Sequence, residues 1–207
     1  DYSSPLDAMA NVDSGDSWCG TPSASNPCLI RIAPGVYDLG VVGTSSLLVM
    51  RPYVDIEGSG QNTTRLTAGG ATVLGGYPAT VATATNSELR NLTVENTGLA
   101  TYAFAISGSG TTHISQLTNV TAIATGAFDT SSAIINQNTF NFLPKLRNIT
   151  AIASGPNAIG IQNSCSAADI DGAVITATGT LSSTAVTDSN GSGCGQTTVQ
   201  GRMTNVT

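Results

Sequence analysis

Four stretches of this sequence repeat one pattern: RNLTVENTG at 90–98, TNVTAIATG at 118–126, RNITAIASG at 147–155 and DGAVITATG at 171–179. Each stretch alternates apolar with polar residues, which predicts β-strands because neighbouring side chains of a strand point to opposite faces. The pattern recurs at intervals of 28, 29 and 24 residues, and such a period is the signature of repeat architectures. The repeats therefore predict a solenoid, in which each coil stacks on the one before.

Stacking the repeats aligns apolar residues into columns that are expected to face the core. Two neighbouring columns are Leu92, Val120, Ile149, Ala173 and Val206, and Val94, Ala122, Ala151 and Ile175. The strand before them supplies Leu89, Leu117, Leu146, Ile170 and Met203. A further strand is expected to supply Phe104, Ile106, Ala133, Ile135, Ile159, Ile161 and Ala185. Columns stacked about 4.8 Å apart form a dry apolar cylinder.

A recurring asparagine stands at the expected bend between two strands of a coil. It is found at Asn91, Asn119, Asn148 and Asn205, and Gly172 takes its place in one coil. Asparagine tolerates left-handed backbone conformation, and glycine adopts it without cost. The spacing predicts an asparagine ladder whose stacked amides hydrogen-bond from rung to rung.

The amino-terminal residues predict a short helix that caps the cylinder. Ser4 is a candidate N-cap, Pro5 suits the first helical position, and Asp7 lies in the first turn. We expect one domain over 1–207, with a cap and disulfide loop over 1–28 and coils over 29–207. The alternation of apolar and polar residues in the coils favours an all-β fold.

Asparagine ladders with aliphatic columns resemble the right-handed parallel β-helix of the pectin lyase-like superfamily. The segments DYSSPLDAMANV, CLIRIAPGVYDLG and RPYVDIEGSGQNTTRLTA further resemble the first coils of pectinesterase-like proteins. The resemblance implies a right-handed parallel β-helix with a capping helix. The Gln-Asp pair and the Arg-Pro-Trp-like segment that usually follow in pectinesterase-like proteins do not occur, so the resemblance does not extend to their catalytic motifs.

Composition excludes several classes of partner. The chain has 7 basic and 13 acidic residues, and no basic stripe that could neutralise the phosphates of a nucleic acid. No apolar run is long enough to predict a membrane span. The four cysteines predict disulfides Cys19–Cys28 and Cys165–Cys194, and hence an extracellular or cell-surface protein. The alternative is four buried thiols in a reducing cytosol.

Clustered carboxylates are the candidates for chemistry. Asp55, Glu57 and Glu95 are expected to share one outward face with Arg31 one rung away. Such a group is a weak candidate for catalysis, for a calcium site or for contact with a polysaccharide. In the alternative interpretation, Arg31 pairs with Asp55 across adjacent strands and the glutamates face water. Apart from this weak calcium candidate, we expect no cofactor.

A second acidic pair, Asp169 and Asp171, resembles a glycosidase carboxylate pair. The repeats instead align Lys145, Asp169 and Arg202 in one outward column, and Arg147 with Asp171 in the next. Alternating opposite charges of this kind favour a structural role. Trp18, Tyr53, Tyr77 and Tyr102 are expected either to stack on sugar rings or to pack loops.

The function that we expect is that of a secreted or cell-surface module without catalysis, which serves adhesion, glycan contact or end-to-end assembly. The alternatives are a polysaccharide-processing enzyme (a lyase, hydrolase or esterase) of the pectin lyase-like type, and a filament or fibre protomer. The chain stops at MTNVT, within a repeat. We therefore expect self-association or continuation of the solenoid through the carboxyl-terminal edge.

Overall fold

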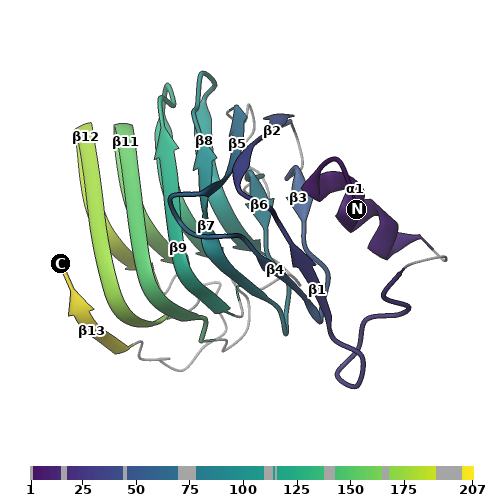
Figure 1. Ribbon diagram of the computed structural model, residues 1–207. Coiled ribbons are helices and arrows are strands. Elements are labelled where there is room, and N and C mark those ends of the chain that lie inside the picture. The colour runs from purple at the N-terminus through teal and green to yellow at the C-terminus, as the bar shows by residue number, and fades with distance from the viewer. Residues whose placement is uncertain are drawn as a thin grey trace.

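The computed structural model describes residues 2–14, 18–43, 46–69, 78–109, 114, 116–137, 143–164, 168–189 and 202–207. These residues form an all-β parallel solenoid with the short helix α1 (Pro5–Asp13) at one end. Figure 1 shows the coils stacked side by side, with α1 beside the first coil and the carboxyl terminus at the opposite end. The predicted solenoid is confirmed.

Thirteen strands in the described part of the chain belong to one sheet. The early strands are short: β1 (Cys28–Arg31), β2 (Gly35–Val41), β3 (Leu48–Val49), β4 (Val54–Glu57), β5 (Thr64–Gly69) and β6 (Val81–Ala82). The later ones are longer: β7 (Glu88–Asn96), β8 (Tyr102–Ser109), β9 (Gln116–Thr125), β10 (Thr130–Gln137), β11 (Lys145–Ser164), β12 (Asp169–Ser189) and β13 (Arg202–Val206). Named strands pair in parallel, each with the strand one coil away.

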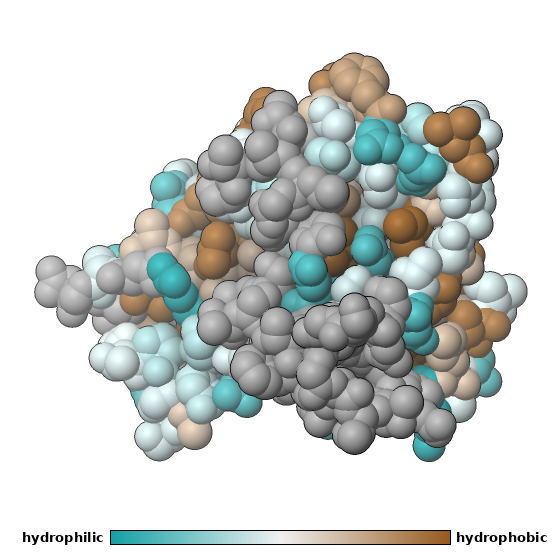
Figure 2. All heavy atoms as spheres, turned by 180° about the vertical axis from the view of Figure 1, so that it is seen from behind, coloured by the Kyte–Doolittle hydropathy of each residue, from teal (hydrophilic) through white to brown (hydrophobic). Residues whose placement is uncertain are grey.

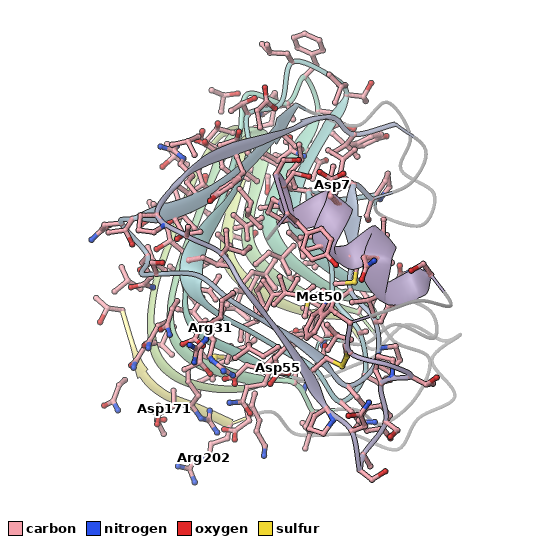
Figure 3. All side chains as sticks on the ribbon, turned by 45° about the vertical axis from the view of Figure 1, so that its right-hand side comes forward. Asp7, Arg31, Met50, Asp55, Asp171 and Arg202 are labelled. Carbon is pink, nitrogen blue, oxygen red and sulfur yellow. A yellow bond between two sulfur atoms is a disulfide. The ribbon has the colours of Figure 1, made fainter. Side chains whose placement is uncertain are left out.

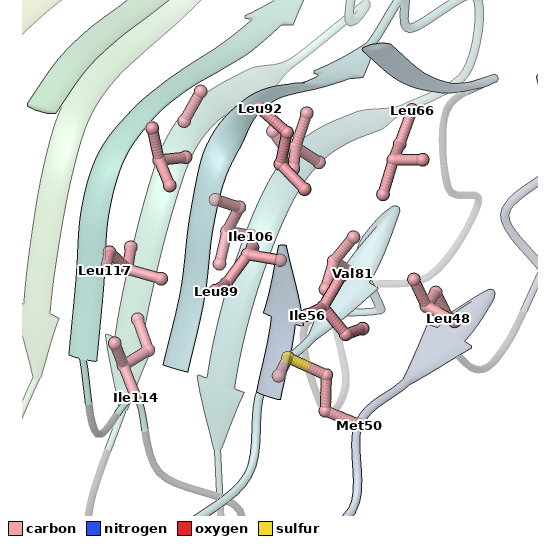
Figure 4. Close-up of a cluster of buried hydrophobic side chains, with 14 of the residues drawn as sticks. Leu48, Met50, Ile56, Leu66, Val81, Leu89, Leu92, Ile106, Ile114 and Leu117 are labelled. Carbon is pink, nitrogen blue, oxygen red and sulfur yellow. The ribbon is translucent and has the colours of Figure 1, made fainter. Parts of the chain in front are cut away.

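The three predicted apolar columns around the asparagine bend have the predicted register. Leu92, Val120, Ile149, Ala173 and Val206 lie in line across β7, β9, β11, β12 and β13. Ile149 is only 1% exposed, whereas Val206 in the last strand is 37% exposed. Figure 4 shows how leucine, isoleucine and valine side chains from successive coils meet inside the cylinder. Burial of these columns is the main source of stability.

The further strand of each coil departs from strict alternation. Ile106, Ala133 and Ile161 reach the main core as expected, but the rest of the expected column is wrong. Ile106 aligns with Ile134 and Ile161, not with Ile135. Phe104 and Ile135 belong instead to a separate cluster with Ala79 and Tyr102. Of the other expected members, Ile159 is half-buried and Ala185 is exposed. The reason is that consecutive residues, Ala105 with Ile106 and Ala133 with Ile134, both reach the main core. A local break in the pleat therefore shifts the inward set by one residue.

The asparagine ladder is present. Asn91, Asn119, Asn148 and Asn205 have φ between 52° and 56°, and Gly172 has φ 68°. The side-chain Nδ2 of Asn119 donates to Oδ1 of Asn91 at 3.0 Å, and that of Asn148 donates to Oδ1 of Asn119 at 3.1 Å. The bend turns each strand at the same place, so the outward residues before and after it lie on different faces.

Helix α1 closes the first coil. Ser4 is its N-cap, and its hydroxyl accepts the N–H of Asp7 at 3.1 Å. Ala8, Met9 and Val12 are buried in the same apolar cluster as the first coils. This face covers apolar side chains that the first coil would otherwise leave exposed.

The predicted disulfide Cys19–Cys28 is present and ties the cap to β1, with a Cα–Cα distance of 6.1 Å. The second predicted pair, Cys165 and Cys194, lies outside the described residues. No helix in the described ranges is long and apolar enough to cross a membrane.

Candidate functional site

The outward face before the asparagine bend carries two columns of polar and charged side chains, which we call the charge ladder. One column comprises Asp55, Glu88, Gln116, Lys145, Asp169 and Arg202. The other comprises Arg31, Glu57, Arg90, Thr118, Arg147, Asp171 and Thr204. Five acidic and five basic side chains therefore share this face. Figure 3 shows Arg31, Asp55, Asp171 and Arg202 on the same side of the solenoid.

Arg31 lies beside Glu57, not beside Asp55 as the sequence alignment suggested. Its Nε is 3.7 Å from a carboxylate oxygen of Glu57. Asp55 aligns with Leu29 and accepts the backbone N–H of Glu88 at 2.8 Å. The structure thus brings Arg31, Asp55 and Glu57 together, but with a register two residues away from the expected one.

Arg90 is the centre of this group. Its guanidinium donates to Glu88 at 2.6 Å, to Glu57 at 3.4 Å and to Asp55 at 3.5 Å. Glu57 also accepts the side-chain amide of Asn91 at 3.3 Å. Three carboxylates therefore share one half-buried arginine, which offsets part of their negative charge.

Glu95 lies apart from Asp55 and Glu57. It follows the bend at Asn91, aligns with Thr67 and Ile123, and forms an ion pair with Arg65 at 2.5 Å. The expected cluster of three carboxylates is therefore divided between two faces. Within the described ranges, no group of three histidine, cysteine, aspartate or glutamate side chains is arranged to hold a metal ion.

The second acidic pair belongs to the charge ladder, as the repeats predicted. Lys145, Asp169 and Arg202 align, and Arg147 donates to Asp169 at 2.6 Å. Asp171 accepts the hydroxyl of Thr204 at 2.7 Å and the amide of Asn205 at 3.0 Å. Both carboxylates are thus engaged by neighbouring rungs.

Hydrogen bonding favours the ionised form of three ladder carboxylates. The guanidinium of Arg90 lowers the pKa of Glu57, and that of Arg147 lowers the pKa of Asp169. The hydroxyl of Thr204 and then the amide of Asn205 lower the pKa of Asp171. A general acid near neutral pH needs a raised pKa, so these three carboxylates are poorly suited to donate a proton.

A cleft of about 480 Å³ lies at the other edge of β1, between β1 and the cap. It is lined by Tyr2, Ser4, Pro5, Ala8, Trp18, Leu29, Ile30, Arg31, Ile32, Ala33 and Tyr37. Trp18 and Tyr2 are 51% and 46% exposed. The sequence had indicated Trp18 and Arg31 separately. Tyr2 was not indicated, because only folding of the cap brings it to β1, and Tyr37 of β2 was not indicated as a cleft residue.

The remaining aromatic candidates have different surroundings. Tyr102 stacks on Phe104 of the same strand, β8, with ring centroids 5.8 Å apart. Tyr53 is half-buried with φ 63° at the turn before β4. Tyr77 lies outside the described residues.

The carboxyl-terminal end exposes apolar side chains of the last coil. Met203 of β13 is 49% exposed, although it aligns with the fully buried Ile170. The strand pairing between β12 and β13 ends where Ala173 aligns with Val206. Elsewhere, on the face shown in Figure 2, apolar side chains are scattered among polar ones over its described part.

Comparison with known proteins gave no match to a protein-family model, to a curated protein or to a solved structure. The structure supports a parallel β-solenoid, and no match supports the resemblance to pectin lyase-like or to pectinesterase-like proteins.

Proposed function

We propose that this chain is a non-catalytic β-solenoid module that acts outside the cytoplasm and assembles with a second copy through its carboxyl-terminal coil. The observation that carries the proposal is the open last coil, where Met203 and Val206 occupy core columns and yet are 49% and 37% exposed. The Cys19–Cys28 disulfide supports an oxidising compartment.

The state of the charge ladder supports a module without catalysis. Asp55, Glu57, Asp169 and Asp171 each have a basic or hydrogen-bonding partner on a neighbouring rung. Ion pairing of this kind stabilises register modestly, and it leaves these carboxylates without the separated roles that acid–base catalysis requires. An assay for reducing sugar and unsaturated uronate, with calcium present, should detect no turnover.

The last coil supports an interface with another strand. Beyond residue 175, no described strand pairs with the outer edge of β12. Unpaired backbone groups along such an edge bind a further strand readily. Added strand pairing would also cover the half-exposed Ile175 and Val186, which pack against the main core.

The cap determines which kind of assembly fits. Because α1 covers the core at the first coil, the open end of one copy cannot stack on the capped end of another without displacing α1. Two open ends can meet around a two-fold axis, which gives a closed dimer. We therefore favour a tail-to-tail dimer over a filament.

Sedimentation equilibrium tests this proposal. The chain of 20.8 kDa should associate to about twice that mass as its concentration rises. Met203→Lys places a charge at the proposed interface and should yield a monomer, because inward-facing charge on an edge strand opposes pairing. Val36→Lys, at an exposed position of β2, is the matched control and should leave the dimer intact. A wild-type chain that stays monomeric at millimolar concentration refutes the dimer.

A further inference from the structure

We propose that β1 binds an extended peptide with an acidic side chain, which enters the cleft beside α1 and pairs with the free edge of β1. This interaction is separate from the tail-to-tail dimer, because it uses the opposite end of the solenoid (Figure 1). Three independent features support it. The edge of β1 is open, Arg31 has a carboxylate neighbour on one side only, and aromatic side chains line the cleft.

The strand edge is open toward the cleft. β1 pairs with β4, and Cys28 and Ile32 donate their N–H groups to Tyr53 and Glu57 at 2.9 and 2.8 Å. Alternate residues of a parallel strand point their backbone groups to opposite sides. Leu29 and Arg31 therefore direct their N–H and C=O groups away from β4. Both residues line the cleft, and among the described strands none but β4 pairs with β1.

Arg31 favours a peptide with a negatively charged side chain. Within the ladder, Arg90 and Arg147 each lie between two rungs, whereas Arg31 stands on the first rung with Glu57 on one side. Its side chain is 79% exposed, and Glu57 is shared with Arg90. Opposite charges on adjacent strands attract each other. A strand added to β1 would therefore gain from a carboxylate opposite Arg31, which continues the sequence of Arg31, Glu57 and Arg90.

The cleft walls suit the rest of such a strand. Tyr2 and Trp18 come from the cap and Tyr37 comes from β2. Among the residues that the structure describes, no acidic side chain lines the cleft. Aromatic rings contribute apolar contact while their polar atoms remain solvated. β1 has four residues, so a paired segment is about 13 Å long. A short extended peptide with apolar residues around one acidic residue matches this length, charge and surface.

Binding of defined peptides to the complete chain tests the proposal by fluorescence anisotropy. The first probe is a labelled heptapeptide with a central glutamate between valines, and the second carries lysine in place of that glutamate. We expect saturable binding of the glutamate peptide, at least tenfold tighter than that of the lysine peptide. Arg31→Glu should reverse this preference. Arg202→Glu makes the same change of charge at the far end of the ladder and should leave the preference unchanged.

A backbone-modified probe separates strand pairing from simple charge attraction. N-methylation of the peptide amides that face β1 removes hydrogen-bond donors without changing charge, and it should weaken binding to wild-type protein at least tenfold. Trp18→Ala should weaken binding of every peptide to a similar extent. The proposal is overturned if N-methylation has no effect, if Arg31→Glu leaves the preference intact, or if the cleft binds neutral or acidic oligosaccharides and none of the peptides.

Discussion

Asn119 donates a hydrogen bond from its side-chain Nδ2 to Oδ1 of Asn91, 3.0 Å away on the preceding coil, while its own backbone has φ 52°. One residue type thus meets two requirements at the bend. It adopts the left-handed conformation that turns the strand, and its amide both donates and accepts along the ladder. The bend also determines which outward residues share a face, because Glu57 and Glu95 lie on either side of it.

Substitutions at Asn119 should separate these two contributions. Asn119→Gly keeps the left-handed backbone but removes the ladder amide, which we expect to cost about 1 kcal/mol. Asn119→Ala removes the amide and also strains the backbone, so its cost should be larger by about 1–2 kcal/mol. Urea unfolding of the two variants measures the difference. Equal stability of the alanine and glycine variants would contradict the role of the left-handed bend.

The core columns were predictable from the sequence because period and alternation agree over several coils. Leu92, Val120 and Ile149 occupy equivalent places in three repeats of nearly equal length, and the structure aligns them. The strand with Phe104 and Ile135 was not predictable in the same way. Two consecutive residues face the core there, and no alternating pattern distinguishes which of two adjacent apolar residues turns inward.

The partner of Arg31 shows a different limit of sequence reasoning. Aligning Arg31 with Asp55 or with Glu57 places the same residues outward, because strand side chains repeat every two residues. Alternation alone therefore cannot choose between two registers that differ by two residues. The pairing of Ile30 with Ile56 inside the core decides it, and Glu57 becomes the neighbour. The sequence indicated Trp18 and Arg31 one by one but not the cleft, since Tyr2 and Trp18 approach β1 and Tyr37 only after the cap has folded.

The interior of the cylinder should not accept a charge. Ile149 lies in the core column and is 1% exposed, so Ile149→Asp should unfold the domain, because an unpaired buried charge costs several kcal/mol. Thr150→Asp places the same charge on the neighbouring outward position and serves as the control. Circular dichroism and thermal melting distinguish the two. A soluble Ile149→Asp variant with unchanged melting would refute the column assignment.

The disulfide between Cys19 and Cys28 should stabilise the cap. It closes a loop with a sequence separation of 9, for which restriction of the unfolded chain predicts about 2–3 kcal/mol. We expect the double variant Cys19→Ser and Cys28→Ser to lose stability of that order in urea unfolding. Amide exchange should accelerate first in α1 and β1, which the disulfide loop joins. Unchanged exchange in both elements would show that the cap is held by its apolar contacts alone.

Acid should weaken the charge ladder. The pKa of Glu57 is lowered from its ordinary 4.5, chiefly by the hydrogen bond from Arg90, and the pKa values of Asp169 and Asp171 are lowered from 3.8. A carboxylate whose pKa is lower in the folded protein contributes stability that is present above its ordinary pKa. This contribution is lost as the pH falls through the lower, folded pKa. The free energy of unfolding should therefore decline as the pH falls below about 4.5.

Replacing one ladder carboxylate should reduce that decline. Glu57→Gln keeps the size of the side chain but removes its titration, so we expect lower stability at pH 7 and a shallower loss between pH 5 and 2. Asp38→Asn removes one acidic charge outside the charge ladder and is the matched control. Urea unfolding across this pH range measures both curves. If Glu57→Gln and wild type lose stability in parallel as the pH falls, the ion pair of Glu57 with Arg90 does not contribute to the acid sensitivity of folding.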